Sequence, residues 1–409
     1  MEASISSPAN GNPGATVRSI QPDSPMEKAG LQSGDRIIKV DDVLISSGEI
    51  WTEINYGLRE NQPAQMLVKR GEQVINTEVE FKAWPKEEHD GLDTYYEEVM
   101  SDYGITQRVI ITVPEKRGPQ PTLVLVGGLS CSSIELHPTR STNWHRTIND
   151  LVEQTGMVMM RIEKPGVGDS NGDCSTSDFL TDLSGYHAAI RMLKTKSYVD
   201  TTNIIIYGSS MGSALAPYLA NEHNLAGVIS DGTFFKTWFE HMLEIERRIR
   251  QMSGDSESEI VEKLNKYYIP LYYKMMIEKK SYQEAIDEYP ALADYNYHSP
   301  DHMYGRPMAY YQQLQDFDLA GGWENLKVPV RIMRGTNDWI MSSFDNQMIV
   351  ALLDRTGHEN HKLFEQAGMD HWNTIHERPD DSFLGNPGQW DDEISGQLVR
   401  WARELAGLD

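Results

Sequence analysis

The feature that most constrains this chain is a five-residue motif that joins an apolar run to a run of small residues. Gly208-Ser209-Ser210-Met211-Gly212 has the pattern G-x-S-x-G, and the apolar residues 204–207 precede it directly. A strand that turns sharply into a helix tolerates only small side chains beside the turn, and the turn holds the serine hydroxyl above the end of a sheet. The helix start also directs N–H groups toward developing negative charge. The motif therefore predicts that Ser210 is a nucleophile.

A second stretch has the same pattern in a different setting. Gly168-Asp169-Ser170-Asn171-Gly172 lies inside the run 164–173, which consists mostly of turn residues, and no periodic helix begins there. A nucleophile turn needs a strand before it and a helix after it. We therefore interpret this second match as a loop on the same side of the sheet.

Apolar strands alternate with helices from residue 107 onward. Strands are predicted at 108–113, 122–126, 157–162, 204–207, 227–229 and 328–333, and helices at 144–154, 179–194 and from 211 onward. Because the strands are apolar throughout and helices separate them, they are typical of a parallel sheet that helices cover on both faces. The predicted fold class is therefore α/β, with a mostly parallel, doubly wound sheet.

This alternation stops between residues 234 and 319. The stretch is helical in character and rich in Tyr, Met and Glu, so we expect a helical lid inserted between two strands of the sheet. Its aromatic and Met side chains suit an apolar or aromatic group of a substrate. Packing of the insertion against the sheet explains the same residues, and the sequence leaves both interpretations open.

The strands near the end of the chain predict where an acid and a base belong. Asp338 follows the apolar strand at 328–333, and His371 follows the predicted last strand at 362–364. With Ser210 they give the order Ser, Asp, His along the chain, which is one of the known orders of a catalytic triad. We expect Ser210, Asp338 and His371 to be the nucleophile, the acid and the base.

Other histidines compete for the role of the base, since the chain contains 12 of them. His376 lies five residues after His371 and is the main competitor, although a solvated loop histidine is the alternative interpretation for it. His358 and His361 fit less well, because they precede the last strand or lie within it.

A tetrahedral oxyanion needs two preorganised N–H donors. The backbone N–H of Met211, which follows the nucleophile, is the first predicted donor. The second is expected from the loop after the strand at 122–126, with Leu129 as the best candidate and Gly128 next.

From about residue 95 to its end, the chain resembles α/β-hydrolases of the serine esterase type with a helical lid. The motifs that carry this resemblance are Gly127-Gly128-Leu129, Pro165-Gly166-Val167-Gly168-Asp169-Ser170, the residues 208–212, Gly335-Thr336-Asn337-Asp338, and His371. Many relatives have His-Gly where this chain has Gly127-Gly128. The resemblance implies hydrolysis of esters, thioesters or amides. A serine nucleophile argues against the dienelactone hydrolase and dehalogenase relatives, which use Cys and Asp.

The first 85 residues are predicted to form a small β-rich domain, followed by a linker at 86–94 and the hydrolase-like domain at 95–409. The small N-terminal domain resembles a PDZ domain of the bacterial type. The resemblance is carried by Ser24-Pro25, Ala29-Gly30-Leu31 and the residues 34–40. PDZ domains bind peptide C-termini beside a sheet edge. In this chain the carboxylate-binding loop would be Asn12-Pro13-Gly14-Ala15, and Pro13 lacks an N–H. The groove is therefore expected to bind either a peptide or the chain's own hydrolase domain.

Composition excludes several classes of partner. The chain carries 37 Lys and Arg against 61 Asp and Glu, a formal net charge of −24, which argues against nucleic acid and anionic membranes. No apolar run reaches the roughly 18 residues that a bilayer crossing needs. The first residues do not resemble a signal peptide, although one could have been removed, so the compartment, cytoplasmic or extracytoplasmic, stays open.

Two cysteines, Cys131 and Cys174, are too few for a disulfide scaffold or a cysteine zinc site. They follow strands that are expected to be neighbours, but we expect two separate thiols. A bond between them would indicate an extracytoplasmic protein.

Three functions are compatible with these features. The favoured one is a serine carboxylesterase that acts on a small or medium acyl ester, without metal or cofactor. The second is a serine peptidase or aminopeptidase of the same fold, in which the PDZ-like domain assists peptide binding. The third is a peptide-binding adaptor whose hydrolase domain is catalytically idle.

Overall fold

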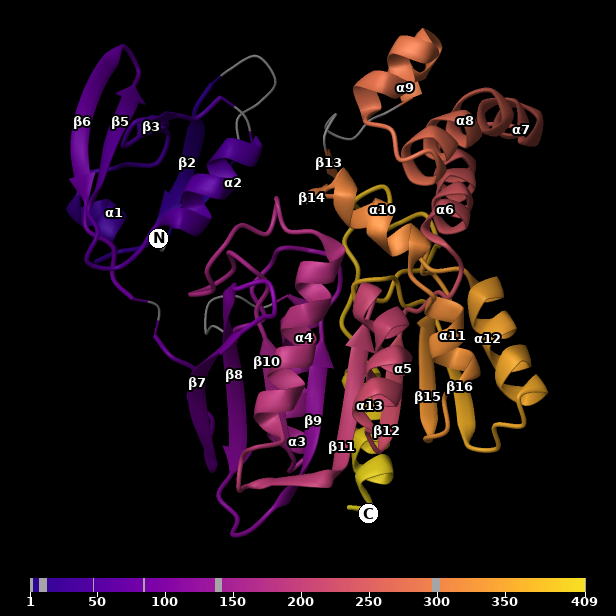
Figure 1. The fold of residues 1–409 in the computed structure, drawn as a ribbon. Helices are drawn as coiled ribbons and strands as arrows, with labels where there is room; N and C mark the ends of the chain where they lie inside the picture. Colours follow the sequence, from indigo (N-terminus) through magenta and orange to yellow (C-terminus); the bar gives the residue numbers. More distant parts are fainter. Residues whose placement is uncertain are drawn as a thin grey trace. The chain divides into compact units, whose positions relative to one another are not determined.

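The computed structural model describes residues 3–6, 13–46, 48–83, 85–136, 142–295 and 302–408, and the chain divides into two compact units, 1–86 and 87–409 (Figure 1). Asn12 of the expected carboxylate-binding loop and Trp84, which precedes the expected linker, lie outside the described residues. The expected linker at 86–94 contributes residue 86 to the first unit and 87–94 to the second.

The first unit is a small antiparallel sheet with two helices. Its strands follow the order β1-β2-β3-β5-β6, and β4 pairs with β3. The elements are β1 (Ala3–Ser6), β2 (Ala15–Ile20), β3 (Arg36–Val40), β4 (Val43–Leu44), β5 (Ala64–Arg70), β6 (Gln73–Val79), α1 (Pro25–Lys28) and α2 (Gly48–Gly57). The Ser24 side chain accepts a hydrogen bond from the Glu27 N–H, and Pro25 begins α1, so the sequence signals for this short helix are confirmed.

The expected carboxylate-binding loop offers few free donors. Gly14 has a φ of 106°, and its N–H donates to the carbonyl of Ile45 at 2.7 Å. Pro13 has no N–H. In the described part of this loop, the amide of Gly14 is therefore already used inside the unit.

The second unit contains an eight-stranded sheet with the order β16-β15-β12-β11-β9-β10-β8-β7. The strands from β16 to β10 are parallel, and β8 and β7 run antiparallel at one edge. Their bounds are β7 (Leu92–Met100), β8 (Thr106–Pro114), β9 (Gln120–Val126), β10 (Val158–Ile162), β11 (Val199–Ser209), β12 (Gly227–Asp231), β15 (Val330–Gly335) and β16 (His361–Gln366). This mostly parallel sheet confirms the predicted fold class.

Helices cover both faces of this sheet (Figure 1). Leu123 and Leu125 of β9 belong to a core that they share with α3 (Asn143–Gln154) and α13 (Asp392–Ala406). Val124 and Val126 face the opposite core, with α4 (Phe179–Leu193), α5 (Met211–His223) and α12 (Ser343–Arg355). Successive residues of β9 therefore point to opposite faces, and both faces are buried.

The insertion between β12 and β15 is largely helical. It consists of α6 (Trp238–Met252), α7 (Glu257–Lys263), η1 (Leu264–Tyr268), α8 (Ile269–Tyr272), η2 (Tyr273–Ile277), α9 (Tyr282–Glu288), η3 (Pro290–Tyr295), β13 (His302–Met303), β14 (Arg306–Pro307), α10 (Met308–Asp316) and α11 (Leu319–Glu324). Tyr268, Tyr272, Met275 and Met276 are buried in the same core as α4 and α5. These four residues therefore pack the insertion, which was one of the two interpretations left open.

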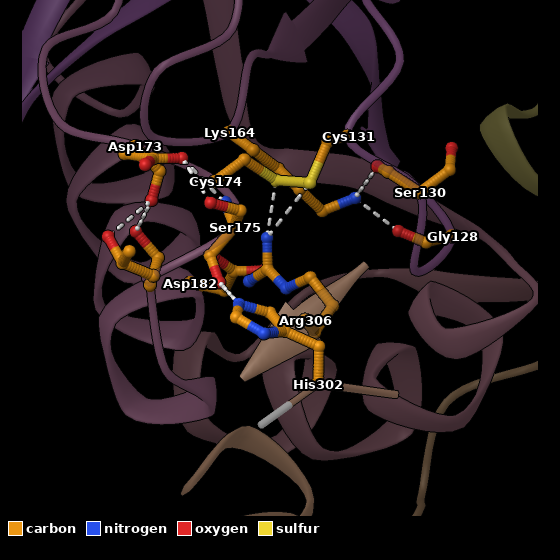
Figure 2. The surroundings of a disulfide bond; sticks show 12 residues. Gly128, Ser130, Cys131, Lys164, Asp173, Cys174, Ser175, Asp182, His302 and Arg306 are labelled. Atoms are coloured by element: carbon orange, nitrogen blue, oxygen red, sulfur yellow. Dashed lines mark hydrogen bonds and ion pairs between the residues drawn. A yellow bond between two sulfur atoms is a disulfide. The ribbon is translucent and has the colours of Figure 1, made fainter. Parts of the chain in front are cut away.

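Cys131 and Cys174 form a disulfide, so the expectation of two separate thiols was wrong (Figure 2). Cys131 lies in the loop after β9 and Cys174 in the loop after β10, and these two strands pair in parallel. The loops that follow two neighbouring parallel strands lie at the same edge of the sheet. The two cysteines are therefore close in space although 43 residues separate them in the sequence. Arg306 of the insertion contacts the Cys174 sulfur and forms an ion pair with Asp182 at 2.5 Å.

Removal of this disulfide is expected to lower the stability of the second unit. A bond that closes a loop of this length stabilises by about 4 kcal/mol in the chain-entropy model, and measured values are typically 2–4 kcal/mol. We expect the Cys131→Ser/Cys174→Ser variant to lose about 2–4 kcal/mol of unfolding free energy in a urea titration. Alkylation of two thiols in unreduced, urea-unfolded wild type would contradict the bond itself.

Candidate active site

Ser210 sits at the sharp turn between β11 and α5. Its backbone has φ 55° and ψ −122°, a conformation that residues other than glycine rarely adopt. A Cβ atom on Gly208 would lie 2.2 Å from the Gly212 carbonyl oxygen, and one on Gly212 would lie 2.0 Å from the Val126 carbonyl oxygen. The steric explanation for the two glycines of the motif is therefore confirmed.

The structure brings His371 and Asp338 to this serine. His371 Nε2 lies 2.9 Å from Ser210 Oγ, and His371 Nδ1 lies 2.9 Å from Asp338 Oδ2. The other carboxylate oxygen of Asp338 accepts hydrogen bonds from the N–H groups of Ile340 and Met341, each at 2.8 Å. Asp338 follows β15 and His371 follows β16, so the two neighbouring parallel strands deliver both side chains to one edge of the sheet.

Electrostatics around this chain of hydrogen bonds favour a charged pair. Burial lowers the pKa of His371, but the charge of Asp338 and its hydrogen bond outweigh burial and raise that pKa above the ordinary value. Burial raises the pKa of Asp338, and the charge and hydrogen bond of His371 outweigh this effect and lower it. Asp338 therefore stabilises the cationic form of His371.

The competing residues lie in other contacts. His376 Nε2 is 3.3 Å from an oxygen of Asp370. His358 Nε2 donates a hydrogen bond to the Val328 carbonyl at 2.8 Å. His361 lies 3.3 Å from Asp354. Ser170 of the second G-x-S-x-G match is buried in a loop, and its hydroxyl accepts a hydrogen bond from the Arg108 N–H.

Two of the three predicted oxyanion donors, Gly128 and Met211, lie beside Ser210. A Cβ atom on Gly128 would lie 3.0 Å from the Ser210 Cβ, so the Gly128 backbone lies close to Ser210. Met211 is the first residue of α5. Within the described part of the chain, the N–H groups of Met211, Gly128 and Leu129 donate no hydrogen bond. These amides are therefore available to a ligand.

Substitution of Gly128 tests its close approach to Ser210. We expect Gly128→Ala to lower ester turnover by about 10- to 100-fold, because the new methyl group collides with Ser210 and displaces its hydroxyl. Gly127→Ala is the matched control, since a Cβ at that position meets no atom within 4 Å. Equal activities of the two variants, measured by steady-state kinetics, would contradict the close approach of Gly128 to Ser210.

Sequence reasoning missed three residues at this site. Asp231 ends β12, its carbonyl accepts from the Ser210 N–H at 2.9 Å, and burial raises the pKa of its carboxyl group to about 7. Gly232 has φ 61°, and a Cβ on it would lie 3.4 Å from the His371 ring. The Asp-Gly pair one residue after the strand predicted at 227–229 was the available signal.

The third missed residue is Arg248 of α6. Its Nε donates to the Trp339 carbonyl at 2.6 Å, and its Nη2 donates to the Ile340 carbonyl at 2.7 Å. These two residues directly follow Asp338. The insertion is therefore tied to the loop that carries Asp338, a contact that no local sequence signal indicates.

Aromatic rings flank the histidine. Trp372 packs edge-on against His371 with ring centroids 5.5 Å apart, and 49% of its surface is exposed. Trp339 lies 5.9 Å from Trp372 and 5.5 Å from Phe383. An apolar surface therefore borders the site on the side of His371.

Among the residues that the structure describes, no group of three or more His, Cys, Asp or Glu side chains gathers as a metal site would require. None of the helices found in those ranges has the length and apolar character for crossing a bilayer.

Two family models match the sequence. The PDZ domain model matches residues 6–81, and the alpha/beta hydrolase family model matches residues 123–384. No curated protein matches the chain.

Solved structures of similar fold include an esterase of Pyrococcus furiosus, with 11% identity, a TM-score of 0.48, and coverage of 79% of this chain and 96% of that chain. Est1E of Butyrivibrio proteoclasticus, solved with ferulic acid, has 14% identity, a TM-score of 0.48, and coverage of 76% and 99%. Acetyl xylan esterase 1 of a Thermoanaerobacterium species has 12% identity, a TM-score of 0.44, and coverage of 79% and 86%.

Proposed function

Because the chain belongs to the alpha/beta hydrolase family, we propose that it is a serine hydrolase that cleaves carboxylic esters through an acyl-enzyme intermediate. The observation that carries the proposal is the pair of 2.9 Å contacts that join Ser210, His371 and Asp338. This arrangement has a nucleophile, a base within reach of its proton, and a carboxylate that orients the base.

The proposed reaction begins when Ser210 Oγ attacks the ester carbonyl carbon and its proton moves to His371 Nε2. Asp338 holds the His371 Nδ1–H and stabilises the imidazolium. His371 then protonates the departing alkoxide, and the acyl group stays on Ser210. In the second half, His371 takes a proton from water, the hydroxide attacks the acyl carbon, and the acid is released as Ser210 regains its proton.

Both tetrahedral intermediates carry a negative oxygen that needs N–H donors. We propose that Met211 and Leu129 supply them, with Gly128 as the alternative to Leu129. The open amides beside Ser210 support this assignment. A donor of this kind contributes about 3–4 kcal/mol to the stabilisation of the transition state.

We propose that the substrate is a small or medium acyl ester with an apolar or aromatic group. The half-exposed Trp372 beside His371, with Trp339 and Phe383, supports this choice because aromatic rings offer apolar contact area next to the reacting atoms.

A second candidate is a serine peptidase, which the PDZ domain at residues 6–81 favours through its possible use in peptide binding. A panel of nitrophenyl esters of increasing acyl length, compared with peptide amides, separates the two candidates by kcat/KM. A fluorophosphonate probe tests the third idea, an idle scaffold, because only an activated serine reacts with it. Turnover of the amides alone would overturn the esterase proposal.

We also propose an oxidising, extracytoplasmic compartment, which the Cys131–Cys174 disulfide supports. For the PDZ groove, docking on the chain's own hydrolase domain remains an alternative to peptide capture. The occupied amide of Gly14 argues against carboxylate capture at that loop.

A further inference from the structure

Lys164 has no part in the reaction as proposed, yet its ammonium group lies at the loop that contains Gly128 and Leu129. We infer that Lys164 is a positioning residue that fixes the peptide between Gly128 and Leu129 so that the Leu129 N–H is presented to the oxyanion. This inference rests on the proposed function and adds one residue to its machinery.

Two hydrogen bonds define the position of Lys164. Its Nζ donates to the Gly128 carbonyl and, at 2.8 Å, to the Ser130 carbonyl (Figure 2). The two acceptors lie on either side of Leu129. Because the donor is charged, these bonds are roughly twice as strong as neutral ones.

Peptide geometry turns these bonds into control of the Leu129 amide. The Gly128 carbonyl and the Leu129 N–H belong to one planar trans peptide, so they point in opposite directions. A donor that holds the carbonyl on one side therefore holds the N–H on the other. Rotation of this peptide would break the bond to Lys164 and would turn the N–H away.

The loop needs such a restraint at this point. Gly127 and Gly128 lack side chains, and glycine leaves the backbone free to adopt many conformations. The disulfide at Cys131 ties the loop to Cys174 three residues beyond Gly128. Lys164 acts closer to Ser210, since the Gly128 backbone itself lies close to that residue.

The environment of Lys164 supports a functional reason for its charge. Burial lowers the pKa of Lys164 to about 8, although the charges of Asp182 and Glu163 oppose this effect. Lys164 is half-buried, and removing an ammonium group from water costs free energy unless hydrogen bonds replace the water. Its two described acceptors are the carbonyls of the loop.

The test compares Lys164→Met with Lys194→Met. Methionine keeps most of the length and volume of lysine but donates no hydrogen bond. Lys194 is the matched control, because its ammonium group also donates to a backbone carbonyl, that of His223, at the end of α4. Each protein is titrated to completion with a fluorophosphonate, and nitrophenyl butyrate turnover is expressed per reactive serine. Binding of phenylboronic acid, which forms a tetrahedral adduct with the serine, is measured in parallel.

For Lys164→Met we expect kcat per reactive serine to fall about 10- to 100-fold with KM within twofold, since loss of a whole oxyanion donor costs about 10²- to 10³-fold. The Ki of phenylboronic acid should rise by a similar factor, because it mimics the transition state. Lys194→Met should keep kcat within twofold.

An unchanged kcat per reactive serine in Lys164→Met, even with fewer reactive serines, would show a purely structural lysine and overturn the inference. A rise in KM alone would also overturn it. If wild type neither turns over the ester nor reacts with the fluorophosphonate, the proposed function fails and this inference fails with it.

Discussion

Replacement of Ser210 by alanine is expected to abolish ester hydrolysis, with kcat reduced by about 10⁴- to 10⁶-fold. The variant lacks the hydroxyl that lies 2.9 Å from His371 Nε2, so the base has no nucleophile to activate. The residual rate would come from binding and from the oxyanion donors. Steady-state kinetics with nitrophenyl esters and loss of fluorophosphonate labelling measure this effect.

The fold should survive this substitution. The main-chain bonds of Ser210, from its N–H to Asp231 and from Ser213 to its carbonyl, do not involve the deleted hydroxyl. Ser170→Ala is the matched control, because Ser170 is the serine of the second G-x-S-x-G match and lies in a buried loop. We expect Ser170→Ala to keep activity within a few-fold. Substantial turnover in Ser210→Ala would refute the assignment of the nucleophile.

Asp338→Asn is expected to reduce kcat by about 10⁴-fold, although asparagine has nearly the same size and shape as aspartate. Two N–H groups, of Ile340 and Met341, point at one carboxylate oxygen and will retain the carbonyl oxygen of an asparagine there. The new NH₂ group must then face His371 Nδ1. A donor in that place forces Nδ1 to accept, which puts the proton on Nε2, where Ser210 needs an acceptor.

The same variant should also change the dependence of the rate on pH. In wild type, burial lowers the pKa of His371 and the charge of Asp338 more than compensates, so the acidic limb of kcat/KM lies above the ordinary histidine pKa of about 6.5. Activity requires neutral His371 and therefore rises with pH through that limb. Without the charge of Asp338, the effect of burial remains, and we expect the limb to move to lower pH.

Asp370→Asn is a closely matched control for Asp338→Asn. One oxygen of Asp370 accepts from the N–H groups of Trp372 and Thr374, and the other lies 3.3 Å from His376. The arrangement repeats that of Asp338 and His371, but no serine of the described ranges forms a hydrogen bond with His376. We expect this variant to stay within about tenfold of wild type. If Asp370→Asn lost more catalytic activity than Asp338→Asn, the result would indicate that His376 is the base.

The sequence predicted those features of the structure that depend on steric contacts between residues close together in the chain. The turn at Ser210 demands glycines at 208 and 212 because any Cβ there would lie about 2 Å from a backbone atom, so the motif and its flanks were sufficient. Asp338 and His371 were found from strand order, because parallel strands place their following loops at one edge. Strand β7 was missed: Tyr95-Tyr96-Glu97-Glu98 at its centre show no continuous apolar run, and the strand pairs at the antiparallel edge.

The sequence by itself determined the class of fold, the position of Ser210 and the order of the three predicted catalytic residues, because periodicity and steric limits act within a few residues. Only the tertiary structure decided that Cys131 bonds to Cys174, that Lys164 reaches Gly128, and that Arg248 holds the loop after Asp338. Each of these contacts joins segments far apart along the chain. No local pattern around Lys164, Arg248 or the two cysteines distinguishes a partner inside the protein from solvent.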